Sequence, residues 1–115
     1  MTAGNYPFEI EQGATLSRPI VWKDANGTPI DVTGYTARLH VRKAVASATT
    51  LLELTSPTEI VVGTTDGKFT INMTDVETAA LTFVSGRYDL EVISPGGVVT
   101  RLLEGKFKVS KEVTR

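Results

Sequence analysis

Basic side chains recur at alternate positions in one segment of the chain. Arg38, His40 and Arg42 share one parity, and Lys43 follows the last of them. Alternate residues of an extended strand point to the same side, so these side chains form one row. Such a row can contact phosphates or an acidic partner, but no aromatic residues are interleaved to stack on bases. We therefore predict a protein contact or a solvated face, and we do not expect nucleic acid as the partner.

Two further groups contain residue types that acid–base catalysis or calcium binding requires. Asp89 and Glu91 lie two residues apart on one strand face, where paired carboxylates do acid–base work only if burial raises one pKa. Arg87 shares that face, so we interpret it as a solvated, charged surface. The segment from Asp24 to Gly27 is similar to the start of a calcium loop, but the glycine comes fourth instead of sixth. We interpret this segment as a tight turn.

The composition removes most catalytic and cofactor chemistry. The 115 residues include no cysteine and one histidine, His40. Thiolate metal sites, disulfides and cysteine nucleophiles are therefore excluded, and a histidine-based triad is nearly excluded. The net charge of -1 disfavours a strongly basic nucleic-acid binder. We expect a protein that is not an enzyme, with no cofactor, no metal and no small-molecule substrate. No apolar run approaches the ~20 residues of a membrane span, so we expect no membrane partner.

Short β-strands account for the positions of these residues. Apolar and polar residues alternate, with the period of half-buried strands, in 8–11, 35–42, 69–73 and 86–92. Turn-forming pairs such as Asn26-Gly27 and Asp66-Gly67 separate the strands. Pro19 places its strand at a sheet edge or at a bulge. The last strand, 98–109, has an uneven parity that predicts a bulge near Glu104 and Gly105.

These strands predict an all-β fold, namely a single Ig-like antiparallel β-sandwich with one short helix. Thr74 and Glu77 fit a capping box that opens this helix at about residues 75–82. We expect the apolar side of the helix to consist of Val76, Ala79, Ala80 and Leu81. We expect one domain over residues 1–115, with an N-terminal arm at about 1–6 and a C-terminal tail at about 110–115.

Further candidate contacts lie outside the basic row. Sheet edges, the N-terminal arm and the 43–49 loop are natural contact elements, because edges and arms can add strands to a partner. Leu51 belongs to the leucine-rich stretch after that loop, which marks an interface if it is exposed and is otherwise part of the core. The candidate partner-contact residues are Tyr6, Arg38, His40, Arg42, Lys43, Val45 and Leu51.

Four segments share a recognisable pattern of turn and strand residues. They are Glu11 to Thr15, Trp22 to Arg38, Gly86 to Val92, and Gly97 to Ser110. Together they resemble a family of small structural proteins of tailed bacteriophages. A similar gapped pattern opens the upper baseplate proteins of some siphophages, where it begins an N-terminal β-sandwich that docks a receptor-binding device onto the tail. The resemblance covers nearly the whole chain.

The resemblance implies a virion structural protein that is assembled in the host cytoplasm. Its expected partners are other virion proteins and copies of itself, and its expected place is the neck, the tail or the fibre attachment. A cysteine-free domain suits assembly in a reducing cytosol. Two alternatives stay open. One is a decoration (cement) protein of the capsid. The other is a receptor- or carbohydrate-binding module, which would need a cluster of exposed aromatic residues.

Overall fold

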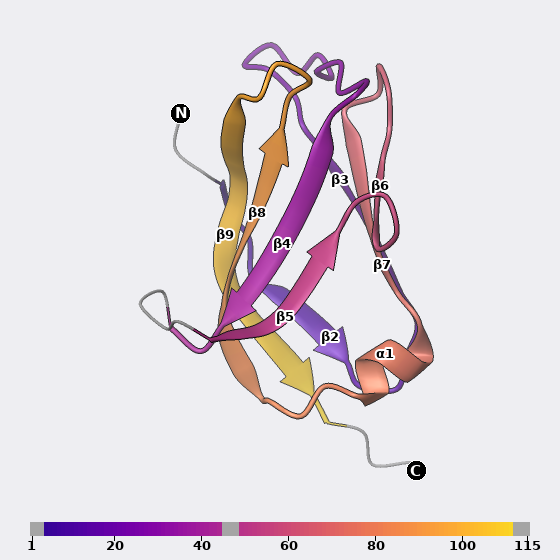
Figure 1. Ribbon diagram of the computed structural model, residues 1–115, viewed down its shortest axis with the longest axis vertical. Helices are drawn as coiled ribbons and strands as arrows, with labels where there is room; N and C mark the ends of the chain where they lie inside the picture. The colour runs from indigo at the N-terminus through magenta and orange to yellow at the C-terminus, as the bar shows by residue number, and fades with distance from the viewer. Residues whose placement is uncertain (1–3, 45–48, 112–115) are drawn as a thin grey trace.

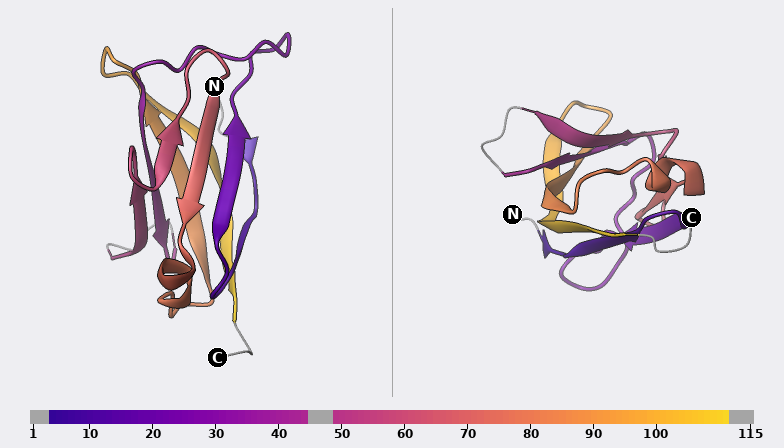
Figure 2. Two further views of the ribbon diagram at one scale, coloured as in Figure 1. Left: turned by 90° about the vertical axis from the view of Figure 1, so that its right-hand side faces the viewer. Right: turned by 90° about the horizontal axis from the view of Figure 1, so that it is seen from below.

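The computed structural model describes residues 4–44 and 49–111, which form two β-sheets (Figure 1). Figure 2 shows the two sheets packed face to face as two layers. The larger sheet, sheet A, has the order β1-β9-β8-β4-β5, and β2 also pairs with β9. Sheet A consists of β1 (Gly4–Asn5), β2 (Phe8–Glu11), β4 (Thr36–Arg42), β5 (Thr50–Thr55), β8 (Ser85–Ile93) and β9 (Val99–Ser110). The smaller sheet, sheet B, has the order β3-β7-β6 and consists of β3 (Leu16–Val21), β7 (Lys68–Met73) and β6 (Ile60–Val62).

The order of the strands is that of an Ig-like sandwich. The chain crosses between the sheets after β2, β3, β5 and β7, so strands that are consecutive in sequence often lie in different layers. The all-β, Ig-like fold predicted from the sequence is confirmed. One pairing departs from the expected antiparallel arrangement, because β1 and β2 run parallel to β9. The first and last strands of the chain are therefore neighbours.

The core lies between the two sheets and is built from the residues at alternate positions of the strands, whose side chains point inward. Its largest fully buried side chains include Phe8, Phe69, Phe107, Ile10, Leu39, Ile60, Ile71 and Leu90. Phe8 stacks on Phe107, with ring centroids 5.5 Å apart. Trp22 meets Tyr35 edge-on at 6.1 Å and packs against the core. Apolar burial between the layers is thus the main stabilising term.

The start of the chain lies along β9. Gly4 and Asn5 pair with the middle of β9, and the backbone N–H of Tyr6 donates to the carbonyl of Glu104 at 2.9 Å. Residues 4–6 of the expected N-terminal arm are therefore part of a sheet edge. At the other end, β9 continues to Ser110, which was expected to begin the tail, and residues 112–115 lie outside the described part of the chain.

A buried tyrosine and a glycine hold this first strand in place. The hydroxyl of Tyr88 donates to the carbonyl of Tyr6. Burial is the main cause that raises the pKa of Tyr88, so its hydroxyl stays a donor at neutral pH. Gly105 has a φ of 156°, and a Cβ at that position would lie 2.7 Å from the carbonyl oxygen of Tyr6. Only glycine lets the first strand approach β9 this closely.

The bulge in β9 lies earlier than predicted. Leu90 is opposite Leu103 and Glu91 is opposite Arg101, so Leu102 is the extra residue. The bulge turns Leu102 into the core, where it is 8% exposed, and leaves Arg101 on the outside. The prediction placed the bulge near Glu104 and Gly105, because a glycine inside a strand often marks one, but Gly105 instead makes room for the first strand.

The helix α1 (Asp75–Ala79) is shorter than predicted, and the predicted capping box is present. Thr74 Oγ1 accepts from the N–H of Glu77 at 3.1 Å, and Glu77 Oε1 accepts from the N–H of Thr74 at 3.0 Å. In the described part of the chain, no helix is long and apolar enough to span a bilayer.

The inward side of α1 is polar, so the predicted apolar side is wrong. Val76 is 73% exposed, whereas Thr78 is fully buried. Thr78 Oγ1 donates to the carbonyl of Ala14 at 2.8 Å and accepts from the N–H of Gly13 at 3.0 Å. These bonds attach the helix to the turn between β2 and β3. Of the predicted apolar residues, Leu81 alone is buried, and it lies beyond the end of the helix.

Candidate functional site

The outer side of sheet A gathers charged side chains from three adjacent strands. Residues of β4, β8 and β9 alternate between buried and exposed positions, so every second side chain points outward. We use the name charged face for the outward residues Arg38, His40, Arg42, Arg87, Asp89, Glu91, Arg101, Glu104 and Lys106. The bulge at Leu102 matters here, because it keeps Arg101 and Glu104 on the same side of β9.

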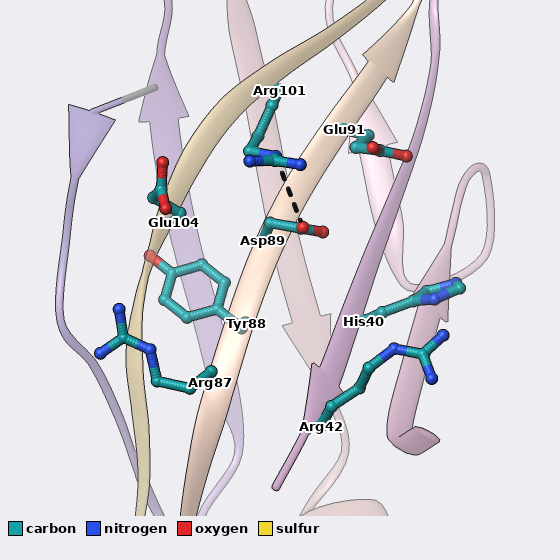
Figure 3. Close-up of a pocket in the computed structure, with 8 residues that line it drawn as sticks. All are labelled: His40, Arg42, Arg87, Tyr88, Asp89, Glu91, Arg101 and Glu104. Carbon is teal, nitrogen blue, oxygen red and sulfur yellow. Dashed lines mark ion pairs between the residues drawn. The ribbon is translucent and has the colours of Figure 1, made fainter. Parts of the chain in front are cut away.

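A hollow of about 300 Å³ opens in the charged face (Figure 3). It is lined by His40, Arg42, Arg87, Tyr88, Asp89, Glu91, Arg101 and Glu104. The register of β4 on β8 places His40 opposite Asp89, but Arg42 opposite Arg87. Figure 3 shows Arg87 turned toward β9 and Arg42 turned away from it. The charges are therefore mixed in the middle of the face and cationic at one end.

Ion pairs hold the mixed part of this face. Arg38 donates to Glu91 Oε1 through Nη2 at 2.8 Å and through Nε at 2.9 Å. Arg101 Nε lies 3.5 Å from Asp89 Oδ2, and His40 Nε2 lies 3.2 Å from Glu53 Oε2 on β5. The side chains are 25–56% exposed, and such exposed pairs contribute at most about 1 kcal/mol each. Their main effect is to fix the directions of charged groups on rigid strands.

Asp89 is a half-buried carboxyl in the middle of this face. Burial raises its pKa above the usual value, and the neighbouring Glu91 raises it further. Arg101 and His40 lower the pKa, and Glu104 raises it, but the net shift is upward. The carboxylate of Asp89 is therefore partly desolvated although it has a guanidinium partner. A charged group in this state gains from a new cationic or hydrogen-bonding partner on another molecule.

The predicted basic row lies on one face of β4, as the alternation indicated. Its members differ in their surroundings, which the sequence did not show. Arg38 and His40 each face a carboxylate, from β8 and β5 respectively. Arg42 lies at the cationic end of the hollow, and Lys43 is exposed just beyond the strand.

The other predicted contact residues lie elsewhere. Tyr6 lies at the edge formed by β1 and β2, where its hydroxyl accepts a hydrogen bond from Arg18 Nη1 at 3.0 Å. Leu51 is 36% exposed on β5, at a register shift opposite β4. Val45 lies outside the described residues. The structure thus places the basic row of β4 beside acidic and basic side chains of β8 and β9. Tyr6 lies at a different edge of the sheet.

Sequence reasoning missed the contribution of β9 to this face. Arg101 and Glu104 are three residues apart, which in a regular strand puts them on opposite sides. The bulge between them brings both into the hollow. The uneven parity of the last strand was the available signal, but it did not locate the extra residue. Among the described residues, no group of three or more His, Cys, Asp or Glu side chains is placed to hold a metal ion.

No protein-family model matches the sequence, and no curated protein is significantly similar to it. One solved structure similar to this chain is the extracellular domain of the voltage-gated sodium channel β4 subunit, which is described as a parallel homodimer. The alignment covers 98% of this chain and 97% of the β4 subunit chain. Its TM-score is 0.49 and its identity 11%. A second structure of sodium channel β subunits aligns over 96% of both chains with a TM-score of 0.49 and 14% identity. A structure of Tim-1 aligns with 100% of this chain and 99% of its own, with a TM-score of 0.42 and 16% identity. These similarities concern the arrangement of the strands alone.

Proposed function

We propose that this chain is a non-catalytic protein-binding module that serves as a structural component of a tailed-bacteriophage virion. The charged face carries the protein-binding part of this proposal. It presents fixed charges of both signs around a hollow on rigid strands. Complementary charges of this kind orient a partner and exclude wrong partners. The two carboxylates that are candidates for acid–base work, Asp89 and Glu91, are each engaged by an arginine.

The virion part of the proposal rests on the sequence. The segments that resemble small tailed-phage structural proteins extend from Glu11 to Ser110, and that resemblance implies a β-sandwich. The observed fold is compatible with it. The proposed location is the virion, at the neck, tail or fibre attachment, after assembly in the host cytoplasm.

The proposed partners are other virion proteins and copies of this chain. The edge strand β5 offers a place for an added strand, because β4 is its one partner within the described residues. β5 has no proline and one charged residue, Glu53. By contrast, the edge strand β3 contains Pro19, and the edge strand β6 has only three residues. Edges without proline and with few charges are the ones that accept another strand.

Mass spectrometry of purified particles of the encoding phage tests the virion assignment, with labelled peptide standards to count copies. We expect a few to a few dozen copies per particle, which fits the neck, tail or fibres. Hundreds of copies would favour capsid decoration instead. Absence from the particle would overturn the structural role. A receptor- or carbohydrate-binding role has weak support from the described residues, because Tyr6 is the one exposed large aromatic and its hydroxyl is occupied.

A further inference from the structure

A second pocket, of about 410 Å³, lies on sheet A where β8 begins, toward the lower end of the molecule in Figure 1. We call it the basic pocket. It is lined by Lys43, Val84, Ser85, Gly86, Arg87, Lys106, Phe107 and Lys108. Arg87 also lines the hollow of the charged face, so the two sites are continuous.

The basic pocket has a single sign of charge. Lys43, Arg87, Lys106 and Lys108 are cationic, and none of the lining residues is acidic. In the described part of the chain, the ion pairs involve other residues. The register places Glu9 beside Lys108, and Glu104 precedes Lys106 by two positions. Neither of these carboxylates lines the pocket, so all the charged side chains of its lining are cationic and attract an anionic ligand.

The basic pocket also has an apolar part. Val84 is 58% exposed, which is a large fraction for an apolar side chain at a pocket. Phe107 is fully buried beneath it and is held by Phe83, with ring centroids 5.9 Å apart. Lysine side chains add aliphatic stems beside such a site while their charged ends reach the solvent. A ligand that fits this pocket therefore has negative charges around an apolar group.

We infer that the basic pocket binds an acidic polypeptide segment that carries one apolar side chain. The charges of the pocket complement an acidic segment, and Val84 would be covered by the apolar side chain. Nucleic acid fits less well, because Phe107 is fully buried and no exposed aromatic lines the pocket for bases to stack on. This inference rests on the proposed protein-binding function and specifies the chemistry of one partner.

A peptide titration of the isolated chain tests the inference. The probe is a pentapeptide with four aspartates around a central leucine, followed by amide NMR shifts of the labelled protein. We expect shifts at residues 84–87 and 106–108 and at Lys43. The same peptide with a central serine should bind more weakly, and a peptide with four lysines should not bind. The double variant Lys43→Glu with Lys106→Glu should weaken binding at least about tenfold, because two attractions become repulsions.

The matched control changes the net charge equally at a distance from the pocket. Lys23→Glu with Lys68→Glu alters two exposed lysines outside the pocket, and binding should stay within about twofold. Val84→Ser is a second variant that removes the apolar part without changing the charge, and it should reduce the preference for leucine over serine. Equal loss in the two charge variants, or no shifts at the pocket, would overturn the inference. Equally tight binding of a decathymidylate would replace it with a nucleic-acid site. Because the test uses the isolated chain, its outcome is independent of whether the chain is found in virions.

Discussion

The outer sides of the two sheets differ sharply, although both sheets cover the same core. Sheet A presents the charged face with its hollow. On sheet B, the outward residues of the three strands are Ser17, Pro19, Val21, Val61, Lys68, Thr70 and Asn72, with a single charge. A nearly neutral outer side is therefore sufficient for a sheet of this sandwich. The charges on sheet A exceed what the fold requires, which is why we place recognition there.

Matched charge reversals on the two sheets give the largest expected difference. Arg38→Glu on sheet A replaces the partner of Glu91 with a like charge, and Lys68→Glu makes the same change in net charge on sheet B. Juxtaposed like charges in an interface cost several kcal/mol. We expect the copies per particle to fall at least about tenfold for Arg38→Glu and to be unchanged for Lys68→Glu, as counted by mass spectrometry. Equal incorporation of both variants would remove the functional distinction between the two faces.

The parallel edge of sheet A has no counterpart in sheet B, and Gly105→Ala is the sharpest way to disturb it. The new Cβ would meet the carbonyl oxygen of Tyr6 at 2.7 Å, in a backbone conformation that favours glycine. We expect a loss of ~3 kcal/mol in the free energy of unfolding, measured by urea denaturation. Ser110→Ala, at the exposed end of the same strand, is the control and should change stability by less than about 0.5 kcal/mol.

Tyr88→Phe tests the hydrogen bond that fixes the same edge. The ring remains in the aromatic cluster with Phe8 and Phe107, and the donor to the Tyr6 carbonyl is lost. We expect a loss of about 1–2 kcal/mol and a smaller effect than that of Gly105→Ala. Amide hydrogen exchange at residues 4–6 should quicken more than exchange in sheet B. Unchanged protection at residues 4–6 would show that the hydroxyl does not hold the strand.

Asp89→Asn gives the smallest expected effect, and the size of this effect depends on pH. The pKa of Asp89 is raised in the folded state by burial and by Glu91. The folded protein therefore holds this proton more tightly than the unfolded chain, so the contribution of Asp89 to stability falls as pH rises from the usual value near 3.8 through the raised pKa. We expect Asp89→Asn to raise Tm slightly at pH 7, and the advantage to disappear near pH 3. Thermal unfolding across this range would contradict the prediction if the variant were less stable at pH 7.

The strands and their faces were predictable because their chemistry is local. The row of Arg38, His40 and Arg42 follows from alternation alone, and the capping box of Thr74 follows from a spacing of three residues. Pro19 correctly indicated an edge strand. Each of these features depends on neighbours within a few residues, which a single sequence displays directly.

The features that the sequence did not reveal depend on distant residues. Val76 looked like the inward residue of α1, but Thr78 occupies that place because its hydroxyl reaches Gly13 and Ala14. Gly105 looked like a bulge, but its role is set by the approach of Tyr6. The hollow forms because the register of β4 on β8 places Arg42 opposite Arg87. The bulge in β9 turns the side chain of Arg101 to the outer side of the sheet. Only the three-dimensional register shows these combinations.

The parallel pairing of β2 with β9 has a consequence for how the protein is made. Phe8 is paired with Phe107, a separation of 99 residues (107 minus 8) that spans almost the entire chain. Contacts this distant in sequence form slowly, because a long loop must close before they are made. During synthesis, Phe8 and Ile10 leave the ribosome long before Phe107 and Val109, their partners in β9. Until then, the apolar side chains of Phe8 and Ile10 are exposed to solvent. The larger sheet is thus completed only after β9, the partner of β1, β2 and β8, has left the ribosome.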